Sequence, residues 1–291
     1  MQILRGRARD LGGGFQVSRL LPSGVRPSVG PFVFLDHFGP VVIEPHMNVD
    51  VRPHPHIGLA TVTYLFEGAM MHRDSLGSVQ RIEPGAINWM SAGRGIVHSE
   101  RTPEDLRAVR HRTHGLQLWV ALPKAREDGE PRFSHTPAAR LAPFTEQGAE
   151  VSVLLGAAFG VESPVRTASD TLFVVMRLPA QQDFQWPAAA GEAAVYPIDQ
   201  DLEVGGEKVE GKSLAILENG KSVVLRSTGD GIVVIIGGAP VDAARHLWWN
   251  FVSSDLARID QAAADWQAQR FPAVPGESEY IPLPAGRPTP P

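Results

Sequence analysis

Residues 54–68 read HPHIGLATVTYLFEG, and they contain the run that decides the fold, IGLATVTYLF at 57–66. This run is rich in β-branched and aromatic residues, which favour strands. Alternate side chains of a strand point to opposite faces, and here both faces are apolar, with Ile57, Leu59 and Leu65 on one and Val62, Tyr64 and Phe66 on the other. A strand of this kind is buried on both sides, as when two sheets or two barrels pack together. The run therefore predicts an all-β fold with layered sheets.

Short apolar runs of the same character recur along the rest of the chain. They are Ala86–Met90, Gly115–Leu122, Val151–Leu155, Thr171–Leu178, Leu214–Leu217, Ser222–Arg226 and Gly231–Gly237. The 29 glycines and 25 prolines of the chain are spread between the runs as turn signals. Short strands at this spacing predict a sandwich or a barrel. A stretch rich in proline, alanine and charge, 123–150, separates two halves of similar strand content, which is compatible with a duplicated fold.

One segment near the C-terminal end has the pattern of a helix. Between Ser254 and Phe271, apolar residues recur at steps of three and four, which is typical of an amphipathic helix. Ser254 is expected to cap its start, Asp255 suits the first turn, and Pro272 ends it. The proline-rich tail 281–291 is expected to be extended and partly disordered.

Composition and charge exclude several classes of protein. The length of 291 residues suits two domains, and 43% hydrophobic with 20% charged residues is ordinary globular usage. The net charge of −5 argues against direct binding of nucleic acid, and the short basic trio Arg5, Arg7 and Arg9 is interpreted as solvated surface. No apolar run approaches the roughly 20 residues that span a bilayer, and no apolar signal segment follows the arginines. We expect a cytoplasmic protein that does not bind membranes.

The absence of cysteine narrows the chemistry further. With no thiolate in the chain, any metal must be held by His, Asp or Glu, and any redox chemistry needs a metal or an outside cofactor. Cysteine-based catalysis and disulfide frameworks are excluded.

Two three-residue motifs that contain histidine, called the histidine triplets below, offer a metal site of this kind. They are HPH, from His54 to His56, and HSE, from His98 to Glu100. Residues i and i+2 of a strand share a face, so two adjacent strands carrying these triplets can bring three imidazoles and one carboxylate together. Such a donor set suits a first-row transition metal. Pro55 has no N–H to donate, so the first triplet is expected at a strand start, an edge or a bulge.

Other histidines have a structural interpretation that is favoured over a functional one. His111 and His114 are taken as hydrogen-bonding residues that enter the strand 115–122. His72 and Asp74 share a face and could support a site, but a solvated hairpin is favoured. His37 is interpreted as a satisfied core or rim histidine.

Further candidates outside the histidines are also assigned structural roles. Glu67, before Gly68, is taken as a turn residue rather than a further ligand. Trp89 and Met90 are taken mainly as core residues that can line a cavity. Ser91 and Ser99 have no acid–base partner in a nucleophilic arrangement, so a serine hydrolase is rejected.

The segments around the two triplets resemble the pirin family of the cupin superfamily. The resemblance is carried by HPHIGLATVTYLFEG (54–68), IEPGAINWMSAGRGIVHSE (82–100), GPFVFLDHFGP (30–40), HGLQLWVALP (114–123) and the ending at 246–269. It covers nearly the whole chain, about residues 1–275. It implies a bicupin, with two double-stranded β-helix barrels packed together and a short C-terminal helix. The implied domains are a metal-binding barrel at 1–130, a linker at 131–150, and a metal-free barrel at 151–291 that carries the helix and the proline-rich tail.

The resemblance also implies the ligand set and the activity. The family's metal ligands match His54, His56, His98 and Glu100. A common cupin pattern has a glutamate near the place of Ala60, so Glu100 takes the carboxylate role and is the expected catalytic residue. The implied activity is quercetin 2,3-dioxygenase-like, with a flavonol and O₂ as substrates. We expect Fe(II) as the metal, with Ni, Mn, Cu or Zn as alternative occupants.

Two further interpretations stay open beside the dioxygenase. The resemblance implies as the alternative a redox-responsive iron-binding regulator that acts on a transcription factor or a metabolic enzyme. The acidic balance then favours a protein partner over DNA. A purely structural metal is disfavoured, because structural sites are typically closed, tetrahedral and rich in cysteine.

Overall fold

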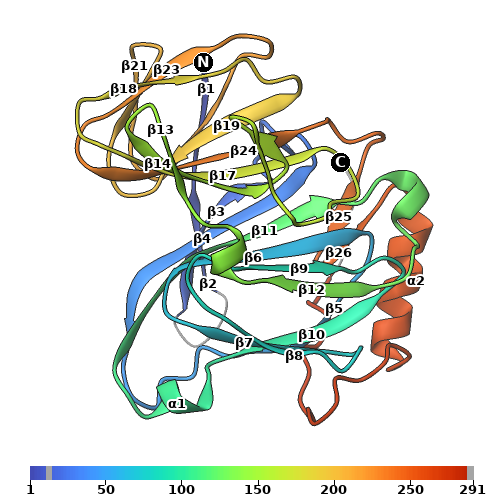
Figure 1. Ribbon diagram of the computed structural model, residues 1–291. Helices are drawn as coiled ribbons and strands as arrows, with labels where there is room; N and C mark the ends of the chain where they lie inside the picture. The colour runs from blue at the N-terminus through green and yellow to red at the C-terminus, as the bar shows by residue number, and fades with distance from the viewer. Residues whose placement is uncertain (11–14, 287–291) are drawn as a thin grey trace. The chain divides into compact units, whose positions relative to one another are not determined.

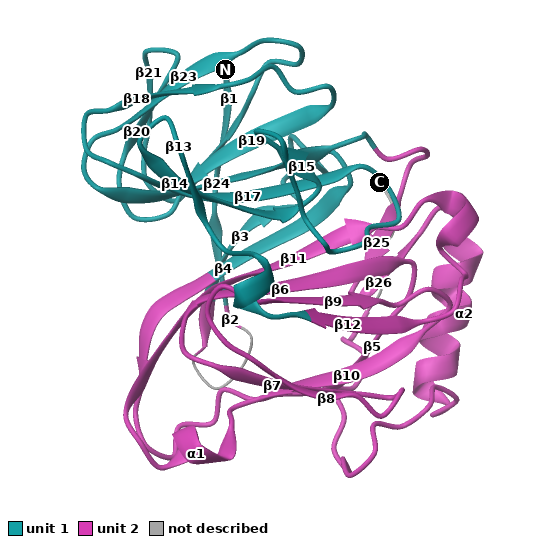
Figure 2. Ribbon diagram, viewed as in Figure 1, with its two compact units in different colours: residues 1–9, 17–37, 136–240 teal, residues 10–16, 38–135, 241–291 magenta. Residues whose placement is uncertain are grey.

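The computed structural model describes residues 1–10 and 15–286 and consists mainly of β-strands (Figure 1). The last five residues of the predicted proline-rich tail, 287–291, lie outside the described residues. The chain divides into two compact units, each built from separated segments (Figure 2). Unit 1 comprises residues 1–9, 17–37 and 136–240, and unit 2 comprises residues 10–16, 38–135 and 241–291. The predicted all-β fold with a short C-terminal helix is confirmed.

Unit 1 contains a larger and a smaller antiparallel sheet. The larger has the order β1 (Gln2–Arg5), β22 (Ser213–Ile216), β19 (Glu192–Pro197), β24 (Gly231–Gly238), β17 (Thr171–Leu178), β14 (Ala149–Leu155) and β13 (Phe144–Glu146). The smaller has the order β18 (Asp183–Trp186), β23 (Val223–Ser227), β20 (Leu202–Val204) and β21 (Glu207–Val209). A short ribbon pairs β15 (Ala157–Ala158) with β16 (Val161–Glu162). Two further strands, β2 (Arg7–Asp10) and β3 (Gln16–Leu21), follow β1 in the sequence.

Unit 2 repeats this arrangement. Its larger sheet contains β12 (Arg132–Thr136), β9 (Ile87–Ser91), β6 (Leu59–Glu67), β11 (His111–Ala121) and, from Phe38 onward, β4 (Phe32–Ile43). Its smaller sheet has the order β5 (Val51–His56), β10 (Ile96–Arg101), β7 (Met70–Asp74) and β8 (Val79–Ile82). The unit also holds the ribbon β25 (His246–Trp248) and β26 (Phe251–Ser253), with the helices α1 (Glu104–Arg107) and α2 (Leu256–Gln267). Two short 3-10 turns occur, one at Lys124–Arg126 in unit 2 and one at Ala138–Arg140 in unit 1.

The two units share one topology. The order 5-10-7-8 of the smaller sheet in unit 2 becomes 18-23-20-21 in unit 1, and 9-6-11-4 of the larger sheet becomes 22-19-24-17. Every strand number in the second series exceeds its counterpart by 13, so the strands follow one another in the same succession in both units. The sheet topology therefore bears out the duplicated fold that the similar halves suggested.

The predicted strands agree with the observed ones, with small shifts at their ends. The decisive run 57–66 forms β6, which begins two residues later, at Leu59. Gly58 has a φ of +68°, and a Cβ at this position would lie 1.9 Å from the carbonyl oxygen of Val252. The backbone therefore turns at Gly58, and Ile57 forms only an isolated bridge to Phe251.

The C-terminal helix is shorter than predicted, and its cap is a different residue. Asp255, not Ser254, is the N-cap, and its side chain accepts a hydrogen bond from the N–H of Ala257 at 2.9 Å. Ser254 instead donates its backbone N–H to Glu127 at 3.0 Å. The helix ends at Gln267 rather than near Phe271, because Gln269 has a φ of +55° and turns the chain away.

The buried face of α2 packs within unit 2. It consists of Ile259, Ala262 and Trp266, and it joins one apolar cluster with Ile57, Val97, Phe251 and Val274. The predicted domain ranges assign this helix to the C-terminal barrel, whereas by contact it belongs with the strands that carry the histidine triplets. The compact units thus differ from those ranges at both ends of the chain, because residues are grouped by packing rather than by sequence order. None of the helices in the described part of the chain is long and apolar enough to cross a membrane.

Candidate metal centre

The two histidine triplets lie on neighbouring strands of unit 2. β5 and β10 pair antiparallel, and His54 stands directly opposite His98. β5 is the edge strand of its sheet, which is one of the positions predicted for Pro55. The ladder is irregular between His98 and Glu100, where β5 contains one extra residue. Such irregularities redirect side chains and are common beside functional sites.

Three imidazoles converge at this point. His54, His56 and His98 each offer one ring nitrogen, and these atoms lie within 4.8 Å of one another. The ring centroids are 4.4–5.0 Å apart, and the three residues are between 1% and 6% exposed. The predicted convergence of the two triplets therefore holds for their histidines, and this buried group can hold a metal ion.

Two of the rings are oriented by backbone carbonyls. The Nδ1 of His54 lies 2.9 Å from the carbonyl oxygen of Arg52, and the Nδ1 of His56 lies 3.0 Å from that of Asn250. A carbonyl only accepts hydrogen bonds, so each Nδ1 carries the proton and each Nε2 keeps its lone pair. The Nε2 of His56 faces the Nε2 of His98 at 3.1 Å. Two nitrogens each about 2.1 Å from one ion lie about 3 Å apart, so this spacing suits a shared cation.

Burial keeps these rings neutral. It lowers the pKa of His54 to about 4, although the hydrogen bond to Arg52 opposes the shift. Burial, followed by the charge of the neighbouring histidine, lowers the pKa of His56 and of His98 well below the usual value. Neutral imidazole is the form that binds metals, so the group needs to release no proton at neutral pH. The residues present therefore fit a divalent transition metal.

Glu100 stands apart from the close group. Its carboxylate is not among the described ligand atoms that lie within 4.8 Å of one another. It pairs with Val51 on β5, beyond the irregular step, and with His72 on β7. Burial raises the pKa of the Glu100 carboxyl to about 7. A carboxyl of this kind can take up or release a proton near neutral pH.

His72 and Asp74 are buried behind His98, not solvated as the sequence interpretation favoured. They are 4% and 0% exposed, and the Nε2 of His72 lies 3.0 Å from an Asp74 carboxylate oxygen. The Nδ1 of His72 lies 3.4 Å from the Nδ1 of His98. The signal that could have found the pair is its H-x-D spacing, the same as that of the H-x-E triplet, on a third short strand.

The remaining candidate histidines lie away from this group. His111 and His114 fall inside β11, which begins four residues before the predicted strand, and His111 bonds the carbonyl of Val109 at 3.0 Å. His37 is a buried histidine of unit 1 whose Nδ1 lies 2.7 Å from the hydroxyl of Tyr196, so the core interpretation holds. Glu67 ends β6 and pairs with Arg112 at 3.0 Å.

The C-terminal segment, residues 274–281, is attached to the two ligand strands. Ile281 donates its N–H to the carbonyl of Pro53, next to His54, at 2.8 Å. Glu277 accepts a hydrogen bond from the hydroxyl of Ser99, next to His98, at 2.8 Å, and it is ion-paired with Arg101. The C-terminal segment therefore fixes both strands that carry the histidines, although it is distant from them in the sequence.

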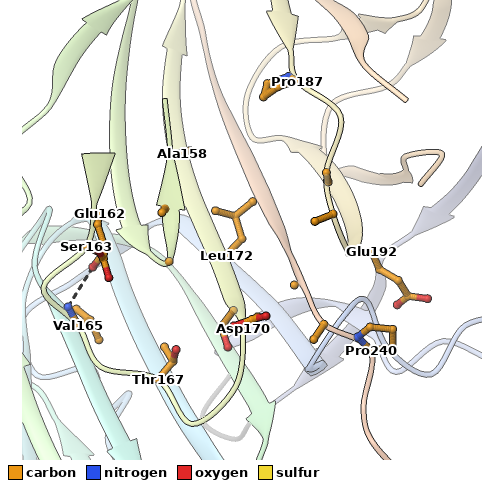
Figure 3. Close-up of a pocket in the computed structure, with 18 of the residues that line it drawn as sticks. Ala158, Glu162, Ser163, Val165, Thr167, Asp170, Leu172, Pro187, Glu192 and Pro240 are labelled. Atoms are coloured by element: carbon orange, nitrogen blue, oxygen red, sulfur yellow. Dashed lines mark hydrogen bonds between the residues drawn. The ribbon is translucent and has the colours of Figure 1, made fainter. Parts of the chain in front are cut away.

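Two cavities of similar volume lie away from the three histidines. One, of about 820 Å³, is in unit 1, and Figure 3 shows Glu162, Thr167, Leu172, Glu192 and Pro240 among the residues around it. The other, of about 800 Å³, is in unit 2 between the ends of β6, β8 and β11. Neither is lined by His54, His56 or His98, so donor geometry and not cavity size identifies the metal centre.

Comparison with protein families matches both halves of the chain. Residues 14–120 match the family described as "Pirin", and residues 173–272 match the "Pirin C-terminal cupin domain". A "Pirin-like protein" of Caulobacter vibrioides is 43% identical over 96% of this chain and 97% of its own length. A Pseudomonas aeruginosa protein named "Putative quercetin 2,3-dioxygenase PA1205" is 40% identical over 92% of this chain and 84% of its own.

Among solved structures, the chain is similar to a quercetin 2,3-dioxygenase from Acinetobacter baumannii. The TM-score is 0.92 at 32% identity, and the alignment covers 99% of this chain and 96% of the other. The similarity therefore extends over both units and the whole topology.

Proposed function

The chain belongs to the pirin family, and we propose that it is a metal-dependent dioxygenase that opens the ring of quercetin-like flavonols with O₂. Two kinds of observation support the proposal. Similar proteins carry the name quercetin 2,3-dioxygenase, and unit 2 presents three neutral, buried imidazoles around one point. The observation that carries it is the pair of Nε2 atoms of His56 and His98, which face each other at 3.1 Å.

In the proposed site, His54, His56 and His98 hold the metal, and Glu100 is the fourth ligand and the catalytic residue. We propose Fe(II) as the resident metal, with Ni, Mn, Cu or Zn as alternatives to be tested. When bound, the metal supplies a positive centre that lowers the pKa of a substrate hydroxyl. The histidines contribute fixed, neutral donors, because carbonyls orient two of the rings and burial keeps them unprotonated.

Glu100 is proposed to accept the proton of the substrate hydroxyl. With a pKa raised to about 7 by burial, its carboxyl is a stronger base than an exposed one and is still partly ionised at neutral pH. Its place outside the close group of histidines is compatible with a ligand that would leave the metal to take a substrate proton. A nearby cation would lower this pKa, so the value describes the metal-free site.

The ring of Trp119 helps to keep water out of the site. It packs edge-on against His56 with ring centroids 5.1 Å apart, and it is 6% exposed. A dry site strengthens the electrostatic interactions of the ligands and the base.

The test combines metal analysis with O₂ uptake on one sample. Fe(II)-loaded protein is expected to hold one metal per chain and to consume O₂ with quercetin, and His56→Ala should lose both properties. His111→Ala, a change outside the site, serves as the matched control. Normal turnover by His56→Ala would contradict the site. Metal binding without O₂ uptake would instead favour the regulatory prediction, and pull-downs from iron(II) and iron(III) samples would then look for a protein partner.

A further inference from the structure

We infer that Asp74 and His72 form a positioning chain that fixes the ring of His98, so that its Nε2 is the nitrogen presented to the metal. The inference rests on the proposed metal site. The three residues lie side by side on β7 and β10, where His98 pairs with Asp74 and Glu100 pairs with His72. Their side chains form one buried series, from the carboxylate of Asp74 through the ring of His72 to the ring of His98.

The chemistry of these groups gives the series of hydrogen bonds from His98 through His72 to Asp74 one direction of donation. An ionised carboxylate only accepts, so the Nε2 of His72 donates its proton to Asp74 across 3.0 Å. With the His72 proton on Nε2, we assign its Nδ1 as the acceptor of the Nδ1–H of His98 at 3.4 Å. The Nε2 of His98 is left with its lone pair, and this is the atom that faces His56 at 3.1 Å.

Asp74 and His72 fix the Nδ1 proton of His98, as backbone carbonyls fix the Nδ1 protons of the other two ligands. His54 and His56 have their Nδ1 protons fixed by the carbonyls of Arg52 and Asn250. His98 has a second imidazole at this place, and a neutral imidazole can present either a donor or an acceptor. The charge of Asp74 decides whether His72 presents a donor or an acceptor to His98. Outer partners of this kind orient metal ligands and raise their basicity.

Both members of the chain are held in place by other contacts. The second carboxylate oxygen of Asp74 accepts the N–H groups of Leu76 at 2.9 Å and Ser78 at 3.0 Å, which close the turn after β7. Burial alone would raise the pKa of Asp74, but hydrogen bonds from His72 and Ser78 outweigh it, so the pKa lies below the usual value and the carboxyl is ionised. The ring of His72 is stacked on Phe133 at 4.2 Å and 10°.

Asp74→Asn tests the direction of the chain while preserving the turn. The amide oxygen can still accept from Leu76 and Ser78, so its NH₂ group faces His72 and donates to it. His72 then carries its proton on Nδ1 and donates to His98, which moves the His98 proton to Nε2, the metal-facing atom. We expect the metal affinity to fall by about 10- to 100-fold, as for other outer partners of ligand histidines.

The readouts do not depend on turnover. Nitrogen-15 chemical shifts of the metal-free protein are expected to show His98 protonated on Nδ1 in the wild type and on Nε2 in Asp74→Asn. Chelator competition with Co(II) gives the affinity, and the visible absorption bands of the Co(II) form report on the ligand set. Asp201→Asn is the matched control, because Asp201 in unit 1 also accepts a backbone N–H, that of Gly211, and lies beside a basic side chain, Lys208.

A second variant keeps the test independent of the turn. His72→Phe retains an aromatic ring to stack on Phe133 and removes the acceptor for His98, so it should also weaken the metal. Unchanged Co(II) affinity and an unchanged His98 proton position in both variants would overturn the inference. A wild-type protein that binds metal without oxidising quercetin would contradict the proposed function alone, and the affinity comparison would still decide the role of Asp74.

Discussion

The smaller sheets of the two units have the same strand order and opposite side-chain chemistry at matched positions. In unit 2, the facing pair on β5 and β10 is His54 and His98, and in unit 1 the corresponding pair on β18 and β23 is Phe184 and Leu225. The end of the first strand carries His56 in one unit and Trp186 in the other. On the third strand, the matched residues are His72 and Asp74 against Leu202 and Val204. All these side chains are buried.

The difference shows that the strand scaffold does not determine the chemistry of its interior. A buried polar group is costly unless its hydrogen bonds are satisfied, so a histidine cluster requires partners from several elements. Unit 2 provides them through Asn250, Asp74 and the C-terminal segment. Unit 1 fills the same positions with Phe, Leu, Val and Trp side chains, none of which offers a ligand to a metal ion.

The largest expected effect comes from giving unit 2 a residue of unit 1. His98→Leu places the counterpart of Leu225 among the ligands and removes one of three nitrogens, so bound metal should fall from one per chain to almost none. Metal analysis after dialysis measures it. His111→Leu is the control and should retain the ion. A His98→Leu protein that keeps one tightly bound metal would show that the cluster is not the site.

The second effect tests the apolar interior of unit 1. Phe184 is 1% exposed, and Phe184→Ala is expected to lower the free energy of unfolding by about 3–5 kcal/mol through lost burial and an unfilled cavity. Denaturant unfolding provides the value. The folded variant should still bind one metal, because the ligands lie in unit 2. Loss of metal from the folded variant would mean that the two interiors are not independent.

The third effect concerns pH and isolates His54. Its pKa is about 4 in the folded metal-free protein and about 6.5 when unfolded, so the unfolded chain binds more protons between these values. Stability contributed by neutral His54 is therefore lost as pH falls below about 6.5. Glu100, whose folded pKa of about 7 exceeds its unfolded value, acts in the opposite sense between about pH 7 and 4.5.

Comparing the wild type with His54→Phe, the counterpart found in unit 1, separates these contributions. Between pH 6.5 and 5, the metal-free variant should lose about 2 kcal/mol less of its unfolding free energy than the wild type. Urea unfolding at the two pH values provides the comparison. Equal losses would indicate that His54 is not buried as a neutral ring.

The smallest effects compare an ion pair of each unit. Glu277 is a largely buried partner of Arg101 and Ser99, so Glu277→Gln should cost about 1–3 kcal/mol. Asp183 pairs with Arg226 on the exposed side of unit 1, and Asp183→Asn should leave the melting temperature unchanged. Thermal melting at low and moderate salt tests both. A larger shift for Asp183→Asn than for Glu277→Gln would reverse the comparison.

Much of the site was predictable from local sequence, and some of it was not. The triplets at 54–56 and 98–100 identify the three histidines, because the two-residue period of a strand places alternate side chains on one face. The same period gave no reason to prefer burial over solvation for His72 and Asp74, since a short hairpin strand of mixed polarity is compatible with both. The proposed role of Glu100 as a ligand stays a prediction.

The sequence by itself determined the all-β class, the succession of strands and the convergence of the three histidines, because strand propensity and alternation are properties of neighbouring residues. Only the tertiary structure decided which carbonyl orients His56, which charge stands behind His98, and with which unit the C-terminal helix packs. The carbonyl that orients His56 belongs to Asn250, a residue 194 positions away. Contacts over such separations depend on register and packing across strands, and no local pattern encodes them.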